Sequence, residues 1–108
     1  MLFDVRTIER PPWTVVAVVG DVDLATMPSL STHLGAAEAS ALALDISGVD
    51  HFDPLCFGVV VAAALRAKRR QGKFCVVCPP GRPRELFAES GLDKIVAVVA
   101  ARSELQPL

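Results

Sequence analysis

Ala41-Leu42-Ala43-Leu44-Asp45-Ile46 is the stretch of this 108-residue chain that decides its fold. A short apolar run with one polar side chain, closed by Ser47 and Gly48, is typical of a strand that is buried on both faces. Such strands occur in parallel sheets, where a helix connects each strand to the next. The stretch therefore predicts a buried strand of an α/β sheet.

The segment that follows this strand predicts a short loop over residues 49–52 and then a helix. Asp53 is a suitable N-cap, Pro54 suits the first helical position, and Gly72 follows a basic last turn. The helix is therefore expected to end before Gly72. Further along the chain, the pattern predicts a strand over 73–78, a short helix over 83–90 and a last strand over 95–100.

The segment that precedes this strand predicts two further strands and a helix. Residues 3–8 alternate in polarity. Residues 13–19 contain a β-branched run that predicts a central strand covered on both faces, which Gly20 and Asp21 are expected to end. Thr26 is expected to cap a helix that reaches about Ser40. The whole order predicts one α/β domain over residues 1–108, with a mostly parallel mixed sheet of about five strands and helices packed on it.

Composition excludes several classes of protein. The chain is 52% hydrophobic, which argues against disorder, but its longest apolar stretches, 55–65 and 95–101, are too short for the roughly 20 residues of a membrane span. Eleven Lys and Arg against 12 Asp and Glu give a net charge of -1, which argues against nucleic acid as a partner. The N-terminus shows no secretory signal, and three Cys suit a reducing compartment, so a cytoplasmic protein is expected.

No motif in the sequence indicates catalysis, a cofactor or a metal site. The sequence has no phosphate-binding glycine loop, nucleophile elbow or zinc-binding helix motif. His33, on the polar side of the first helix, and His51, in a loop, are expected to be solvated. Cys75 and Cys78 form a CxxC pattern along a strand, where residues three apart point to opposite faces and do not bridge readily.

Cys56 offers a second interpretation of the cysteines. It falls in the first turn of the helix that Asp53 caps, where free backbone N–H groups favour a thiolate, although Asp53 opposes that effect. Cys56 and Cys78 are both expected at the carboxyl edge of the sheet, so a redox pair is one alternative. A small side chain that lets the helix pack closely on the sheet is the other.

The helix over residues 55–67 is apolar on nearly all sides. Either a partner protein or neighbouring elements must cover the apolar surface that the sheet does not bury. The basic residues that follow, from Arg66 to Lys73, are expected to be a solvated helix end that complements the helix dipole.

Four segments in order resemble the STAS domain of bacterial anti-sigma-factor antagonists, from about Val15 to Val99. They are Gly20-Asp21-Val22-Asp23-Leu24-Ala25-Thr26 with Pro28 and Leu30, Leu42-Ala43-Leu44-Asp45-Ile46-Ser47-Gly48-Val49, Phe52-Asp53-Pro54-Leu55-Cys56-Phe57-Gly58-Val59, and Glu85-Leu86-Phe87 to Gly91-Leu92-Asp93.

The resemblance implies a STAS fold and a non-enzymatic regulatory role. Such domains bind an anti-sigma factor, often a serine kinase, and so make a sigma factor available for transcription. In the family the kinase phosphorylates the second hydroxyl residue of a D-S-S/T-G loop. Here Pro54 and Leu55 stand at the two hydroxyl positions and Cys56 at the glycine. Because leucine has no hydroxyl, and Thr26 and Ser47 are displaced from that position, the resemblance implies constitutive binding.

The partner contacts that the resemblance implies lie in two loops. The purely structural alternatives are a solvated turn at Asp21 and Asp23 and a helix cap at Asp53. Two other functions stay open: a scaffold or homodimer that associates through the apolar helix face, and a sensor with a small-ligand pocket near Gly48 and Pro79. The implied contact residues are Asp21, Asp23, Thr26, Asp53, Pro54, Leu55, Cys56, Phe57 and Gly58.

Overall fold

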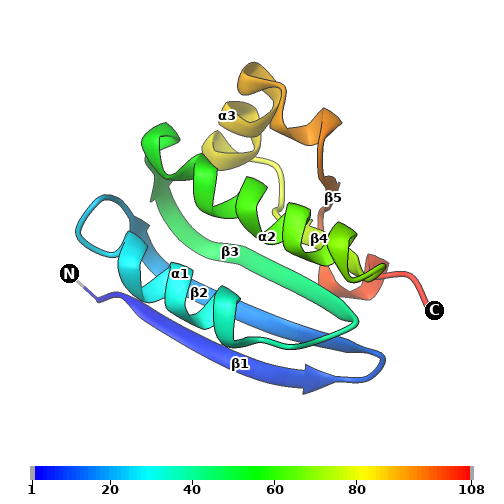
Figure 1. Ribbon diagram of the computed structural model, residues 1–108. Helices are drawn as coiled ribbons and strands as arrows, with labels where there is room; N and C mark the ends of the chain where they lie inside the picture. Colours follow the sequence, from blue (N-terminus) through cyan, green and yellow to red (C-terminus); the bar gives the residue numbers. More distant parts are fainter. Residues whose placement is uncertain (1, 108) are drawn as a thin grey trace.

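The computed structural model describes residues 2–107, and its elements follow the predicted order. Two N-terminal strands precede three helices that alternate with the remaining strands (Figure 1). Short 3-10 turns lie before α2, after α3 and near the C-terminus. The bounds are β1 Asp4–Arg10, β2 Trp13–Val22, α1 Met27–Ala36, β3 Ala41–Phe52, η1 Pro54–Cys56, α2 Phe57–Arg69, β4 Lys73–Val77, α3 Arg82–Ser90, η2 Leu92–Lys94, β5 Ala97–Val99 and η3 Arg102–Glu104.

The strands form one sheet in the order β1-β2-β3-β4-β5, with β3 at its centre. β1 is antiparallel to β2, and every other neighbouring pair is parallel. The decisive stretch, residues 41–46, is buried throughout because α1 and α2 cover one face and the C-terminal segment covers the other. The prediction of a mostly parallel five-stranded α/β sheet is confirmed.

All three helices pack on the same face of the sheet. Figure 1 shows α1 and α2 side by side over the strands, and apolar side chains from α1, α2 and α3 share one core with β2, β3 and β4. The aromatic rings of Phe52, Phe57 and Phe87 meet in this core with centroid distances of 5.1 to 5.6 Å. These tilted and edge-on contacts fix the start of α2 against the end of β3 and against α3.

The opposite face of the sheet has a smaller core with a thin cover. Leu105 packs on this core, and the Trp13 Nε1–H donates to the carbonyl of Gln106 at 2.8 Å. Cys75 lies in this smaller core, whereas Cys78 lies in the helix-side core. The two residues of the CxxC pattern therefore face opposite sides of the sheet, as predicted. The small core consists of Trp13, Val15, Ala41, Ala43, Cys75 and Val77.

Two strands run further than the sequence predicts. Gly20 does not end β2, because it adopts φ +103° and lets the strand continue to Val22 through an irregular register with β3. A Cβ at Gly20 would lie 2.1 Å from the carbonyl oxygen of Leu2, so glycine also permits this close approach. Because β2 stays available for pairing, β3 continues to Phe52, and His51 lies exposed on a strand rather than in the predicted loop.

The other boundary predictions differ by a few residues. α1 ends at Ala36 rather than near Ser40, and its polar residue His33 is half-buried, with Nδ1 at 2.8 Å from the Ser29 carbonyl. The predicted helix over 55–67 is a 3-10 turn followed by α2, which reaches Arg69. The last strand is shorter than predicted, Ala97–Val99.

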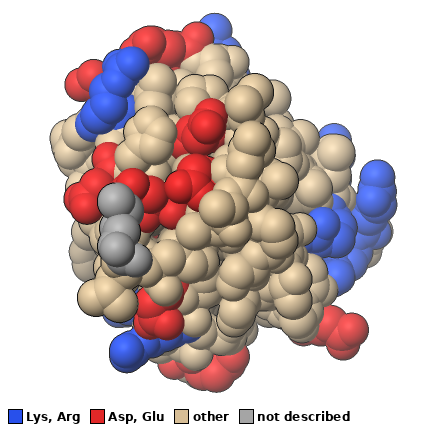
Figure 2. Space-filling view, turned by 90° about the vertical axis from the view of Figure 1, so that its left-hand side faces the viewer, with Lys and Arg blue, Asp and Glu red and all other residues tan. Residues whose placement is uncertain are grey.

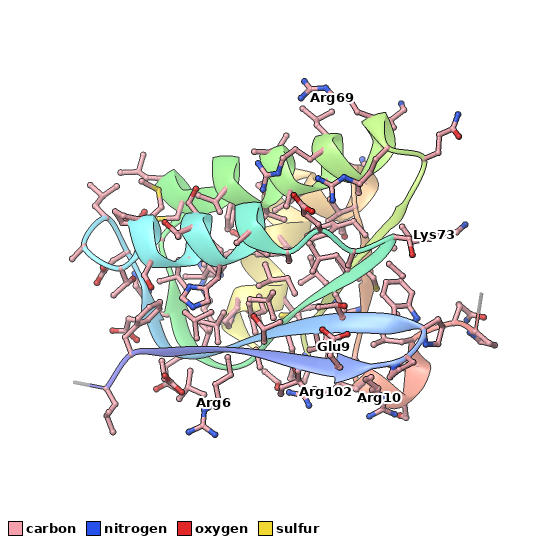
Figure 3. All side chains as sticks on the ribbon, turned by 60° about the horizontal axis from the view of Figure 1, so that its bottom comes forward. Arg6, Glu9, Arg10, Arg69, Lys73 and Arg102 are labelled. Atoms are coloured by element: carbon pink, nitrogen blue, oxygen red, sulfur yellow. The ribbon has the colours of Figure 1, made fainter. Side chains whose placement is uncertain are left out.

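Asp45 is the one buried charged residue that residues 2–107 contain, at 3% exposure. Its Oδ1 accepts hydrogen bonds from the backbone N–H and the hydroxyl of Ser47 at 2.9 and 2.7 Å. Its Oδ2 accepts from Arg102 Nε at 2.5 Å, which ties η3 to β3; Figure 3 shows Arg102 on the side of the sheet away from α1 and α2. Burial alone raises the pKa of Asp45, but the bonds from Ser47 and Arg102 outweigh it and hold the pKa below its ordinary value.

Asp45→Asn is expected to lower the free energy of unfolding by about 1 to 3 kcal/mol at pH 7, because it leaves Arg102 without its carboxylate. A carboxyl whose pKa is depressed by folding stabilises the protein above its unfolded-state pKa, and that contribution disappears as the pH falls through its folded-state pKa. The difference between wild type and variant should therefore shrink on acidification, as measured by urea unfolding at pH 7 and near about pH 3.

Asp93→Asn is the control, because it removes an exposed carboxylate and should shift stability by no more than about 0.5 kcal/mol. A difference between wild type and Asp45→Asn that is constant over the whole pH range would contradict the role of the Asp45 charge.

Candidate functional site

Two loops meet at the carboxyl edge of the parallel strands. The first joins β2 to α1 and the second joins β3 to η1 and α2, and both lie at the left of Figure 1. The backbone N–H of Asp53 donates to the carbonyl of Val22 at 2.8 Å and so links them directly. The two segments that the resemblance singles out are therefore neighbours in space.

The first loop is shaped by its own polar side chains. Asp23 Oδ1 accepts hydrogen bonds from the N–H groups of Ala25 and Thr26, both at 3.0 Å. The Thr26 hydroxyl donates to the carbonyl of Asp21 at 2.8 Å and accepts from the N–H of Asp23 at 3.0 Å. These bonds hold the loop so that Leu24 stands at its tip, 57% exposed.

Thr26 differs from its predicted role. It occupies the N-cap position of α1, but its side chain does not bond to an N–H of that helix. Its hydroxyl is engaged by the loop instead, since Asp21 and Asp23 offer a nearer donor and acceptor. Thr26 and Asp23 therefore determine the conformation of the loop, whereas the side chain of Asp21 is half-exposed.

The second loop begins with the predicted cap. Asp53 Oδ1 accepts from the N–H of Leu55 at 2.9 Å, and the Asp53 carbonyl accepts from the N–H of Cys56 at 2.8 Å. Asp53 thus caps the short turn η1, with Pro54 in its first position, and α2 begins at Phe57. The cap directs the Leu55 side chain outward, where it is 73% exposed.

The implied contact residues divide by burial. Pro54, Leu55 and Gly58 are exposed, but Cys56 is fully buried and Phe57 is 9% exposed. Phe57 is held by the rings of Phe52 and Phe87, so Cys56 and Phe57 lie in the core of the free domain, and a contact between them and a partner stays a prediction. The contact residues implied by the sequence do not include Leu24. An apolar residue in a predicted polar turn, between Asp23 and Ala25, could have indicated its exposure.

The exposed part of the two loops is apolar at its tips and acidic around them. We call it the acidic pole: the exposed Leu24 and Leu55 with the carboxylates of Asp21, Asp23 and Asp53. Figure 2 looks onto this end of the molecule and shows several acidic side chains close together near its middle. Residues 11–65 contain six Asp and Glu and no Lys or Arg, so β2, α1, β3 and the start of α2 bring no positive side chain to the pole.

The cysteines are buried thiols. Burial raises the pKa of Cys56, and the nearby charges of Asp53 and Asp23 raise it further. Burial also raises the pKa of Cys78, and Asp45 adds to this effect while Arg84 opposes it. Burial and the two carboxylates therefore outweigh the backbone N–H groups at the start of the helix, which favour the thiolate of Cys56. A redox pair with Cys78 stays a prediction.

The remaining features bear on ligands and membranes. Residues 2–107 include no cluster of three or more His, Cys, Asp or Glu side chains placed to hold a metal ion. Within the same residues, no helix is long and apolar enough to cross a bilayer. A hollow of about 240 Å³ does lie between Ser47 and Pro79, at the strand ends where a ligand pocket was predicted.

The family follows from a comparison with family models. A model described as "Mlab, STAS domain" matches residues 8–99, which is most of the chain. The chain belongs to the STAS domain family. The match extends over both loops of the acidic pole and over β3, so the site lies within the STAS domain itself.

Solved structures show that the STAS fold of this chain is of the SpoIIAA type. An anti-sigma factor antagonist from Mycobacterium paratuberculosis is 24% identical with a TM-score of 0.88, over 95% of this chain and 90% of that one. A putative anti-sigma factor antagonist from Thermotoga maritima is 18% identical with a TM-score of 0.79, over 94% and 89%. The Bacillus cell fate determinant SpoIIAA in its phosphorylated form is 17% identical with a TM-score of 0.68, over 95% of each chain.

Burial predicts that the three thiols of this STAS domain react slowly with Ellman's reagent while the protein is folded. Thiol reactivity follows thiolate content and access, and Cys56, Cys75 and Cys78 are all buried with raised pKa values. All three should react fast in denaturing urea. Ser103→Cys, which adds a thiol at an exposed position, is the control and should give one fast equivalent in the folded protein.

Fast labelling that peptide mapping assigns to Cys56 in the folded wild type would contradict this prediction. A Cys56–Cys78 linkage found by mass after mild oxidation would support the redox pair instead.

Proposed function

We propose that this STAS protein is a non-enzymatic binding protein of the anti-anti-sigma type, which docks an anti-sigma factor on its acidic pole. The observation that supports this most is Leu55, 73% exposed at the tip of a loop whose conformation is fixed by the Asp53 cap. A large apolar side chain held out in solvent by a rigid loop is costly for a free domain and useful in an interface. Leu24 extends the same apolar surface from the first loop.

The charge of the acidic pole indicates what kind of partner surface fits it. Asp21, Asp23 and Asp53 surround the two leucines, so the complementary surface is a basic rim around an apolar pocket. Asp23 Oδ1 and Asp53 Oδ1 are already engaged in shaping their loops, and their other oxygens face outward without a hydrogen bond among residues 2–107. The carboxylates can therefore meet a basic partner without a change of loop conformation.

We further propose that binding is not switched off by phosphorylation. Leu55 stands at the acceptor position that the family resemblance assigns, and leucine offers no oxygen to a kinase. The nearby hydroxyls are engaged: Thr26 bonds within its loop, and Ser47 donates to Asp45 at 2.7 Å. A SpoIIAA structure of the same fold is described as phosphorylated. The leucine at position 55 is therefore the difference from the family motif that bears on phosphorylation. Because the proposed partner is an anti-sigma factor, which regulates transcription, the protein is proposed to act in the bacterial cytoplasm.

The ligand-sensor alternative has weaker support. The hollow between Ser47 and Pro79 holds about 240 Å³, below the roughly 300 to 1,000 Å³ of typical ligand sites. It is also separate from the exposed leucines, so it does not explain them.

Leu55→Asp is expected to weaken binding of a purified anti-sigma factor at least about tenfold. The variant loses the burial of one leucine, about 1.5 to 3 kcal/mol, and places a carboxylate in an apolar contact. Isothermal calorimetry measures the dissociation constant. Leu65→Asp makes the same change at a residue of α2 that is 44% exposed and lies outside the acidic pole, and it should leave binding unchanged. Equal affinity of both variants and wild type would move the partner surface away from the acidic pole.

Leu55→Ser is expected to gain a phosphate when it is incubated with ATP and a kinase that binds the wild type. The substitution restores a hydroxyl at an exposed position without disturbing the core. Phosphate at that position adds a charge of about -1.5 to -2 beside the carboxylates of the acidic pole, so it should also release the partner. Intact mass detects the phosphate.

Pro54→Ser, which adds a hydroxyl one residue earlier and keeps Leu55, is the matched control and should stay unmodified. If Leu55→Ser binds the kinase but is never phosphorylated, the missing hydroxyl is not what disables the switch.

A further inference from the structure

The Lys and Arg residues of this protein are confined to two parts of the sequence. Its Lys and Arg residues all lie in residues 1–10 and 66–108, while residues 11–65 contribute only acidic charge. α2 connects the two ends, since it starts beside the acidic pole and finishes about 20 Å away in a basic turn. Figure 1 shows α2 running from the edge that holds both loops to the opposite edge. α2 therefore connects an acidic surface at its start to a basic surface at its end.

The basic end has five cationic side chains within eight positions. They are exposed or half-buried, and none of them takes part in a salt bridge with a described residue. Figure 3 shows Arg69 and Lys73 pointing outward from the protein. We call this surface the basic pole: Arg66, Lys68, Arg69, Arg70 and Lys73.

The basic pole borders a hollow of about 360 Å³ with a mixed polar and apolar lining. Ala64, Phe74 and Ala97 contribute apolar side chains to it, from α2, β4 and β5. Lys68 and Lys73 also line it and supply its positive charge. The acidic pole differs from it in charge, because its exposed leucines are surrounded by carboxylates.

We propose that the basic pole binds the acidic pole of a second copy of this chain. Leu55 of one copy enters the hollow beside Phe74 of the other, and its acidic rim faces Lys68 and Lys73. The two surfaces are complementary in charge, and each is supplied by a different end of α2. Because the two surfaces lie at opposite ends of α2, a head-to-tail pair leaves one acidic and one basic pole unoccupied, and further copies add in a row.

This proposal rests on the same surface as the proposed function, because both use the acidic pole. Self-association requires that surface but does not depend on which partner protein binds it. A copy whose Leu55 is seated in a neighbour cannot present it to an anti-sigma factor. Self-association and partner binding are therefore competing states, and the balance between them depends on protein concentration and on salt, which screens the charged rims.

Sedimentation equilibrium of the wild-type protein is the first measurement. Its weight-average mass should rise past that of a dimer as the concentration increases at low salt, and should fall toward the monomer near about 0.5 M salt. A monomer at every concentration, or a mass that stops at the dimer, would overturn the proposal.

Two variants test the two surfaces separately. Leu55→Asp puts a charged side chain in place of the leucine that is proposed to enter the hollow. The double variant Lys68→Glu with Lys73→Glu reverses the charge beside the hollow. Each alone should stay monomeric, but a mixture should form a 1:1 pair, since each variant keeps the surface that the other lacks. Arg10→Glu makes the same kind of charge change at an exposed residue outside both poles and should assemble like the wild type. Assembly of the double Glu variant, or no pair in the mixture, would overturn the proposal.

The same proteins separate this inference from the proposed function. The double Glu variant should bind an anti-sigma factor as tightly as the wild type or more so, because its acidic pole is intact and unoccupied. Loss of partner binding in Leu55→Asp without any self-association of the wild type would leave the proposed function standing and refute the row. Binding of the basic pole to vesicles with anionic headgroups, in a wild type that stays monomeric, would likewise replace the second copy with a membrane.

Discussion

The arrangement of the site depends on the pairing of β2 with β3. These strands stay paired well beyond the apolar run at residues 41–46, because Gly20 adopts a backbone conformation that lets β2 continue. The extended pairing ends with Val22 opposite Phe52, and the next hydrogen bond joins Asp53 to Val22. Had β2 ended at Val19, the two loops would separate earlier and Leu24 and Leu55 would not share a surface.

Sequence patterns predicted the sheet, the order of its elements and the Asp53 cap, because each rests on local chemistry: β-branched runs, an N-cap followed by proline, and glycine after a basic turn. They could not predict where β2 and β3 end, since that depends on pairing between distant segments. The Asp45–Arg102 ion pair joins residues 57 positions apart, and no local pattern indicates it. The burial of Cys56 and Phe57 depends in the same way on Phe52 and Phe87.

The residues of the acidic pole divide into those that build it and those that face solvent. Asp23, Thr26 and Asp53 engage their polar atoms within the loops, so their identity is required even with no partner present. Leu24 and Leu55 are the residues whose large apolar side chains the loops hold in solvent. A family motif alone does not make this distinction, because structural and contact residues are adjacent in sequence. Substitutions at the leucines therefore report on binding, whereas substitutions at the three polar residues report on loop stability as well.

Leucine at position 55 changes how such a protein can be regulated. A phosphorylated loop ends an interaction by adding charge at the cost of ATP, and that route needs a hydroxyl. Without it, competition for the same surface offers another route to release, and competition is set by concentrations and affinities alone. The basic pole of a second copy is such a competitor, because its rim and hollow match the acidic pole. An increase in the amount of this protein would then add free acidic poles more slowly than it adds molecules, which buffers the amount available to bind.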